Sequence, residues 1–175
     1  DNLKKIKQDF KNPIFIHLIR HPHSMVTSFE QYHLEQVLYL KEHTYNAKEL
    51  GELIWLQSHQ NILQFLKDIP ANQQFQLRYE DLIQQPEIFI KALCQKTGIS
   101  FHPNLLNPYQ NIEHKAIDGI HKNSRSMSDS NLLKFKKINA TKAEEWKVAL
   151  KDSFLSKTSL ELSADLGYDL ESVEK

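Results

Sequence analysis

A short apolar run that ends at an arginine constrains this chain more than any other feature of its sequence. Residues 14–19, Ile-Phe-Ile-His-Leu-Ile, are almost continuously apolar and rich in β-branched side chains, a pattern typical of a parallel strand buried on both faces. Arg20-His21-Pro22 follow at once, and from Pro22 the apolar positions take helical spacing up to about residue 40. The sequence therefore predicts a strand, a tight turn and a helix in direct succession.

A second strand-to-helix unit follows further along the chain. Residues 74–78 alternate between polar and apolar side chains, which predicts a strand, and residues 86–97 have helical periodicity that ends at Gly98. Two such units predict an α/β fold, with a parallel sheet flanked by helices and ligands held at the carboxyl ends of the strands. Helical periodicity also predicts helices over residues 47–66, 141–150 and 153–166.

Length and charge limit the kinds of protein this chain can be. At 175 residues the length predicts one domain, residues 1–175. Lys+Arg and Asp+Glu balance at 22 each, so we expect neither nucleic acid nor a membrane surface as a partner. The sequence shows neither an apolar stretch of transmembrane length nor a secretory signal, and a lone cysteine, Cys94, rules out an internal disulfide. We therefore expect a soluble, cytoplasmic protein, and the nine histidines show no metal-ligand spacing.

Arg20 is the first candidate for chemistry. An arginine at the carboxyl end of a buried strand points into the crevice where α/β sheets hold ligands, and its guanidinium can bind a phosphate through two parallel bonds. The following helix offers backbone N–H groups and its positive dipole end to the same anion. Ser24 and Ser28 lie one turn apart on that helix and can add hydroxyl donors. The alternative, that Arg20 pairs with a nearby carboxylate, is equally compatible with these residues.

Two segments resemble motifs of a known enzyme family. An apolar strand, Arg-His-Pro, and a serine eight positions after the arginine resemble the 3′-phosphate motif of sulfotransferases that use 3′-phosphoadenosine-5′-phosphosulfate (PAPS). The resemblance implies that Arg20 and Ser28 hold that phosphate. Residues 77–82, Leu-Arg-Tyr-Glu-Asp-Leu, resemble a second family segment, which implies that Tyr79 lies beside the adenine ring. A core tyrosine is the alternative for Tyr79, and we assign the next two residues, Glu80 and Asp81, to capping and structural pairing.

A third resemblance lies towards the C-terminus and is partial. Trp146-Lys147 fit the family's C-terminal region, but residues 139–141, Asn-Ala-Thr, stand where classical members carry Arg-Lys-Gly. The preceding stretch, residues 123–131, looks more like bacterial sulfotransferases, including those of polyketide and peptide synthetase assembly lines. Arg125 in this stretch is a candidate nucleotide contact, and a solvated surface loop is the alternative.

The resemblance implies an enzyme that transfers the sulfuryl group of PAPS to an acceptor hydroxyl and leaves adenosine 3′,5′-bisphosphate. The acceptor would be a small molecule or a carrier-protein-bound polyketide or related bacterial metabolite. The chain resembles a truncated, C-terminal part of the P-loop-like family fold, so the catalytic base and the phosphosulfate loop are expected upstream of Asp1, and this fragment alone is expected to be inactive. A nucleotide kinase-like phosphoryl transferase and a non-catalytic helical interaction module are the alternatives.

Overall fold

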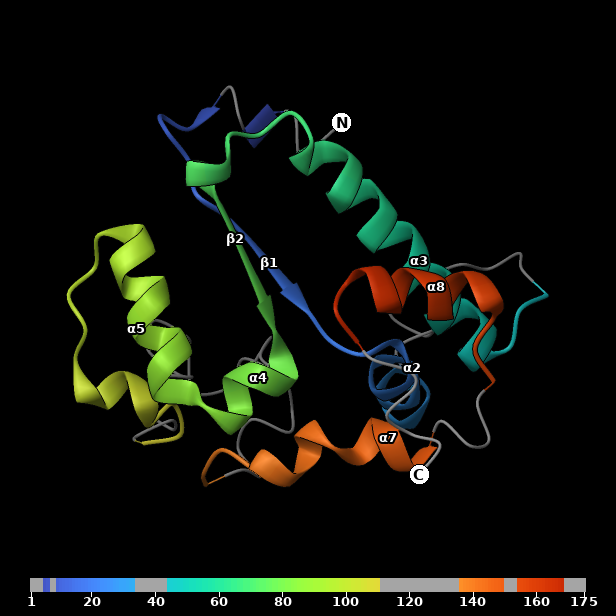
Figure 1. The fold of residues 1–175 in the computed structure, drawn as a ribbon. Helices are drawn as coiled ribbons and strands as arrows, with labels where there is room; N and C mark the ends of the chain where they lie inside the picture. Colours follow the sequence, from blue (N-terminus) through green and yellow to red (C-terminus); the bar gives the residue numbers. More distant parts are fainter. Residues whose placement is uncertain (1–4, 7–8, 34–43, 111–135, 150–153, 169–175) are drawn as a thin grey trace, which may run out of the picture.

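Two parallel strands lie side by side at the centre of the molecule, with helices around them (Figure 1). A computed structural model of the chain describes residues 5–6, 9–33, 44–110, 136–149 and 154–168. The fold is α/β, as predicted. Its α-helices and strands are β1 (Phe15–Ile19), α2 (Pro22–Gln31), α3 (Ala47–Leu66), β2 (Gln74–Arg78), α4 (Tyr79–Gln84), α5 (Pro86–Thr97), α7 (Glu145–Ala149) and α8 (Lys157–Asp165). Short 3₁₀ helices span Ala71–Gln73, Pro103–Leu106 and Ala140–Ala143.

The central elements coincide with the predicted ranges because local signals define their ends. The side chain of Asn46 accepts hydrogen bonds from the first turn of α3, and Glu49 bonds back to the Asn46 backbone, which forms a capping box. Gly98 takes the left-handed conformation, φ 72°, that ends α5. Helix α2 begins at Pro22 as predicted and ends at Gln31, and residues 34–43, onto which its predicted extension falls, lie outside the described part.

The two C-terminal helices are shorter than predicted. Asn139 caps a 3₁₀ turn before α7, so the predicted helix over residues 141–150 begins as 3₁₀ and continues as α-helix only from Glu145. Ser156 accepts a hydrogen bond from the backbone of Ser159 and thereby sets the start of α8. The chain turns out of α8 at Gly167, which has φ 92°.

The register of the sheet brings two predicted site residues to one edge. β1 and β2 pair in parallel with Ile19 opposite Arg78. These are the last residues of their strands. Arg20 and Tyr79, the next residues along the chain, therefore leave the sheet side by side at its carboxyl edge.

The prediction that the first strand is buried on both faces is wrong for the described structure. The side chains of His17 and Ile19 are buried, with Ile19 fully inaccessible, whereas Ile16 and Leu18 on the opposite face are 49% and 52% exposed. Helix α3 covers the inner face, where His59 contacts His17. Helix α5 lies beside β2 rather than over β1 (Figure 1), so the outer face of β1 stays open.

The core joins the end of β1 to the C-terminal helices. Trp55 of α3 is buried, and its indole N–H donates to the backbone carbonyl of Arg20 at 3.0 Å. This bond fixes the chain at the point where it leaves the sheet. The main apolar cluster consists of Ile19, Trp55, Trp146, Leu166 and Tyr168.

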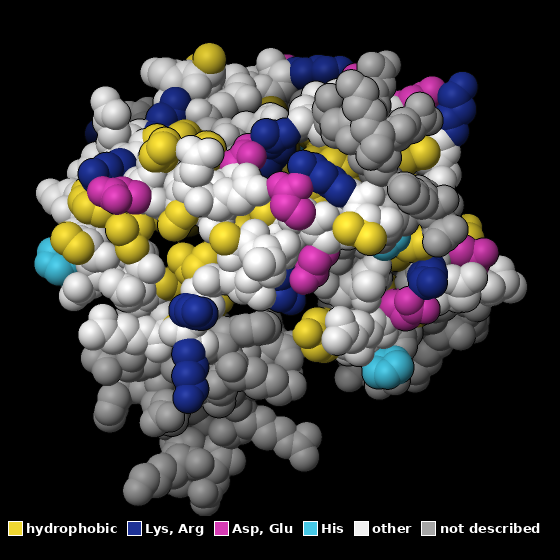
Figure 2. Space-filling model, turned by 60° about the horizontal axis from the view of Figure 1, so that its bottom comes forward, with side chains coloured by type: hydrophobic (Ala, Val, Ile, Leu, Met, Phe, Trp, Pro, Cys, Tyr) yellow, Lys and Arg dark blue, Asp and Glu magenta, His cyan; other side chains and the backbone are white. Residues whose placement is uncertain are grey.

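Charged side chains of both signs lie on the surface (Figure 2). Figure 2 shows basic and acidic side chains interspersed over one face of the molecule. No helix among the described residues combines the length and apolar character needed to cross a bilayer. Within the same residues, no three His, Cys, Asp or Glu side chains are grouped so that they could hold a metal ion.

Candidate functional site

Arg20, Ser28 and Tyr79 meet at the carboxyl edge of the two strands. The Arg20 guanidinium donates from Nη1 to Ser28 Oγ at 3.2 Å, and its central carbon lies 5.1 Å from the centroid of the Tyr79 ring. Ser28 comes from α2 and Tyr79 from the first residue of α4. The structure therefore brings three of the five predicted nucleotide contacts together.

The charge of Arg20 has no counter-charge within the described structure. None of the ion pairs among described residues includes Arg20. The alternative prediction, that Arg20 pairs with a nearby carboxylate, is therefore not met among these residues. The Nε of Arg20 is buried and has no hydrogen-bond partner among them. Buried donors are normally satisfied, and leaving one unpaired is costly. A guanidinium with spare donors, next to a hydroxyl, has the chemistry that a phosphate ligand requires.

Tyr79 is half-buried and presents its ring to the Arg20 guanidinium. Burial raises the pKa of the Tyr79 hydroxyl, and the positive charge of Arg20 acts in the opposite direction. The hydroxyl therefore stays protonated at neutral pH. The site thus combines a neutral aromatic surface with a cation, a pairing suited to a purine base that carries a phosphate.

The start of α2 offers fewer free donors than predicted. The backbone N–H of His21 donates to Glu80 Oε1 at 3.1 Å, and that of His23 donates to the His21 ring. These two groups are therefore not available to an anion. Ser24 is buried on the first turn of α2, and its role as a ligand donor stays a prediction. Arg125 lies outside the described residues.

Glu80 was predicted to cap or pair locally, but its carboxylate bonds two segments distant in sequence. Its second oxygen, Oε2, accepts a 2.6 Å hydrogen bond from the hydroxyl of Tyr168. The ring of His21 stacks on Trp146 with centroids 4.1 Å apart, and Tyr168 meets both rings edge-on. Sequence reasoning missed Tyr168, for which the only sequence signal is an aromatic residue directly after the helix-ending Gly167.

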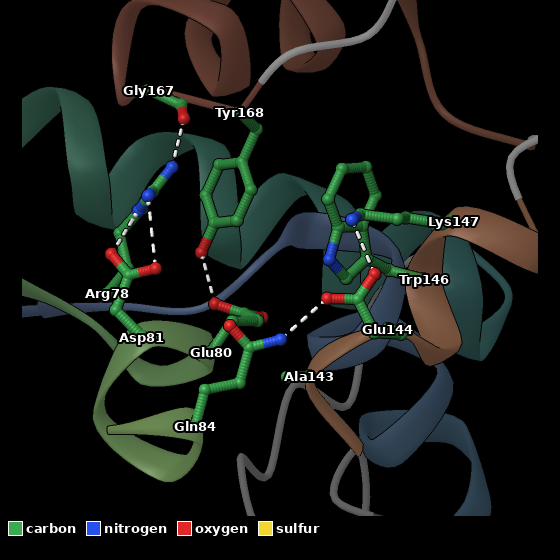
Figure 3. A pocket seen from close by; sticks show the side chains of 10 residues that line it. All are labelled: Arg78, Glu80, Asp81, Gln84, Ala143, Glu144, Trp146, Lys147, Gly167 and Tyr168. Carbon is green, nitrogen blue, oxygen red and sulfur yellow. Dashed lines mark hydrogen bonds and ion pairs between the residues drawn. The ribbon is translucent and has the colours of Figure 1, made fainter. Parts of the chain in front are cut away.

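A cavity of about 180 Å³ lies beside this cluster (Figure 3). Its cations are already paired, since Arg78 bonds both oxygens of Asp81 and the Gly167 carbonyl, and Lys147 forms an ion pair with Glu144. The pairing predicted for Asp81 is confirmed. Among the described residues, the cations that line this cavity are therefore paired, whereas Arg20 is not.

Comparison with known proteins decides the family. A model of the sulfotransferase family matches residues 1–103, which include Arg20, Ser28 and Tyr79. The chain belongs to the sulfotransferase family. No curated protein matches this sulfotransferase chain.

Two solved structures resemble this sulfotransferase chain. The sulfotransferase domain from the curacin biosynthetic pathway is 33% identical with a TM-score of 0.83, and the match covers 96% of this chain and 58% of that one. The sulfotransferase domain from the Synechococcus PCC 7002 olefin synthase is 27% identical with a TM-score of 0.69, and 90% of this chain and 50% of that one are covered. The chain thus spans little more than half the length of these relatives.

The family match and the two solved structures can be compared with the predicted family and with the two alternative functions. Both solved relatives are domains of biosynthetic systems, so the predicted resemblance to bacterial assembly-line sulfotransferases is confirmed. Membership of the family favours sulfuryl transfer over kinase-like phosphoryl transfer. The parallel sheet at the centre of the molecule also argues against a purely helical interaction module.

Proposed function

We propose that this sulfotransferase chain binds the nucleotide end of PAPS at the carboxyl edge of β1 and β2. Arg20 and Ser28 hold the 3′-phosphate, and Tyr79 packs against the adenine. One observation carries the proposal. The three side chains meet, and the Arg20 guanidinium has no counter-charge among the described residues. Ser24 is assigned as a further contact from its place on the helix beside Ser28, and Arg125 from the resemblance of its segment to bacterial sulfotransferases.

Preorganisation supports this role for Arg20. The residue is held at its backbone by the Trp55 indole and at its guanidinium by the Ser28 hydroxyl. A binding group that is already ordered loses little conformational entropy when the ligand arrives. Arg20 can therefore offer guanidinium N–H groups that have no partner among the described residues to a phosphate, without rearranging the strand end.

The proposed reaction is transfer of a sulfuryl group to a hydroxyl. When bound, PAPS supplies an electrophilic sulfur that the acceptor oxygen attacks in line, with adenosine 3′,5′-bisphosphate as the leaving group. The part of this chain is to bind and orient the nucleotide. We assign the base that deprotonates the acceptor to the part of the sulfotransferase domain outside this chain, since the chain spans 58% of the curacin domain.

For the acceptor we propose a hydroxyl on a carrier-protein-bound polyketide or a related bacterial metabolite, in the cytoplasm. The solved relatives support this choice, because they are domains of the curacin pathway and of an olefin synthase. A free small-molecule hydroxyl is the second candidate. Sulfation assays of the whole protein with carrier-bound and free forms of one hydroxy acid distinguish the two.

Calorimetric titration of the chain with adenosine 3′,5′-bisphosphate tests the nucleotide site. We expect binding that Arg20→Ala weakens about 10- to 100-fold, because a charge-assisted hydrogen bond contributes about 1.5–3 kcal/mol. Lys91→Ala is the matched control, since it also removes one positive charge but from α5, where Lys91 pairs with Glu87. The control should bind as the unchanged chain does.

The same titration separates the competing functions. A preference for ATP over adenosine 3′,5′-bisphosphate would support the kinase-like alternative. Absence of binding to either nucleotide, or equal binding by the Arg20→Ala variant and the unchanged chain, would contradict the proposed site.

A further inference from the structure

A single buried carboxylate connects the two strand ends that carry the candidate nucleotide contacts. Glu80 is 6% exposed, and both of its oxygens accept hydrogen bonds. Oε1 bonds the backbone N–H of His21, the residue directly after Arg20. Glu80 itself directly follows Tyr79. The Glu80 side chain thus ties His21, the neighbour of Arg20, to the segment that contains Tyr79, although His21 and Glu80 lie 59 positions apart.

The Glu80 carboxylate interacts through directed hydrogen bonds and not through an ion pair. Among the described residues no cation lies within ion-pair distance of Glu80. Arg78 interacts with Glu80 only beyond ion-pair distance, so the buried carboxylate depends on hydrogen bonds, and bonds to an ionised acceptor are shorter and stronger than neutral ones. The 3.1 Å and 2.6 Å contacts supply this compensation, so the carboxylate fixes the positions of both donors.

The surroundings of His21 make the connection rigid. The His21 side chain is fully buried, stacked on Trp146, with the Tyr168 ring against its edge. Burial lowers the pKa of His21 to about 3, so its ring is neutral at physiological pH and does not draw Glu80 away from the backbone N–H. Figure 3 shows Glu80 between α4 and the Tyr168 hydroxyl. These contacts hold the turn at residues 20–22 against the segment that follows Tyr79.

We propose that Glu80 is a positioning residue, which holds the Arg20 turn against the Tyr79 segment and thereby sets the preference of the site for nucleotides that carry a 3′-phosphate. This inference rests on the proposed function. Glu80 acts through its neighbours and does not itself touch the nucleotide. Without it, the guanidinium keeps its charge but loses its fixed place relative to the Tyr79 ring.

The test compares two nucleotides that differ only in the 3′-phosphate. Calorimetric affinities for adenosine 3′,5′-bisphosphate and adenosine 5′-monophosphate are measured for the unchanged chain and for Glu80→Ala, Glu80→Gln and Tyr168→Phe. We expect the unchanged chain to prefer the bisphosphate by about tenfold or more and Glu80→Ala to reduce that preference about fivefold or more. Glu80→Gln should restore most of it, because an amide oxygen can accept from His21 N–H and the amide N–H₂ can donate to Tyr168.

The matched control is Glu144→Ala. Glu144 lines the same cavity, but its side chain bonds Gln84 and Lys147 and not the Arg20 turn in the described structure, so its removal should leave the preference unchanged. Circular dichroism melting confirms that each variant is folded. If Glu80→Ala does not fold, Tyr168→Phe tests the inference instead, because it removes one of the two hydrogen bonds to Glu80 and keeps the aromatic ring. It should lower the preference, and an unchanged preference would overturn the inference.

The outcomes separate this inference from the proposed function. If the unchanged chain does not prefer the bisphosphate, or if Arg20→Ala has no effect, the proposed nucleotide site itself fails and the inference fails with it. If the preference exists and depends on Arg20, yet a folded Glu80→Ala variant retains it in full, only the positioning role is wrong. The effect of Glu80→Ala should also disappear in an Arg20→Ala background, because residues that act as a unit are not additive.

Discussion

At the scale of single residues, the proposed function depends most on Arg20. Its backbone carbonyl accepts from Trp55, its Nη1 donates to Ser28, and its guanidinium lies over Tyr79. A cation in this position interacts with the negative face of the ring, yet it still lacks an anion among the described residues. The three side chains are therefore ordered without a ligand, and the described residues supply no negative charge to the guanidinium.

The Tyr79 ring can be tested separately from its hydroxyl. Stacking of a base on an aromatic side chain contributes about 1–3 kcal/mol, so Tyr79→Ala should weaken adenosine 3′,5′-bisphosphate binding about 5- to 100-fold. Tyr79→Phe keeps the ring and should bind within about threefold of the unchanged chain. Calorimetry on both variants measures this. Equal losses for Phe and Ala would show that the hydroxyl, and not the ring, contacts the nucleotide.

The strand–turn–helix pattern and the family resemblance predicted that these residues belong to one site, because its members are close in sequence or follow strands. Arg20 and Ser28 are eight positions apart on one strand–turn–helix unit, and Tyr79 directly follows the second strand. The bonds of Glu80 could not be predicted in this way. They join residues 59 and 88 positions apart, and their partners depend on how the sheet register and the C-terminal chain pack.

At the scale of elements, the packing of α3 on β1 rests partly on two histidines. His17 Nε2 and His59 Nδ1 are 2.8 Å apart in the buried interface. Burial lowers the pKa of His59 to about 4, with a smaller contribution from His17, whose own pKa burial also lowers. The pattern of apolar residues predicted the strand and the helix, but it contained no signal for this polar contact between them.

The depressed pKa makes stability depend on pH. Between pH 6.5 and 4 the unfolded chain protonates His59 while the folded chain does not, so stability is full above pH 6.5 and falls as the pH drops. The loss attributable to His59 is about 2 kcal/mol between pH 7.5 and 5. Urea unfolding at both pH values measures it. His21, with its pKa lowered to about 3, acts in the same direction.

A pair of variants separates titration from packing in that interface. His59→Phe removes the titrating ring and should reduce the pH dependence, even if its stability at pH 7.5 is lower. Phe65→Leu alters the neighbouring contact with Phe15 and should lower stability by a similar amount at both pH values. An undiminished pH dependence in His59→Phe would contradict the assignment.

At the scale of the whole molecule, the α/β class and the order of the central elements could be predicted, and the burial of the sheet could not. An unbroken apolar run predicts a strand with two covered faces, but Ile16 and Leu18 are about half exposed in the described structure. The apolar run of one strand shows that its side chains are apolar. It contains no information about which segment covers them, and this chain spans 58% of the length of the curacin domain.

We propose one nucleotide site, at the carboxyl edge of β1 and β2, and a crystal structure of the chain with adenosine 3′,5′-bisphosphate tests this proposal most directly. We expect the 3′-phosphate oxygens within about 2.7–3.2 Å of the Arg20 guanidinium and of Ser28 Oγ, with the adenine against the Tyr79 ring. A nucleotide bound at another surface, or one whose 5′-phosphate occupies the Arg20 position, would contradict it.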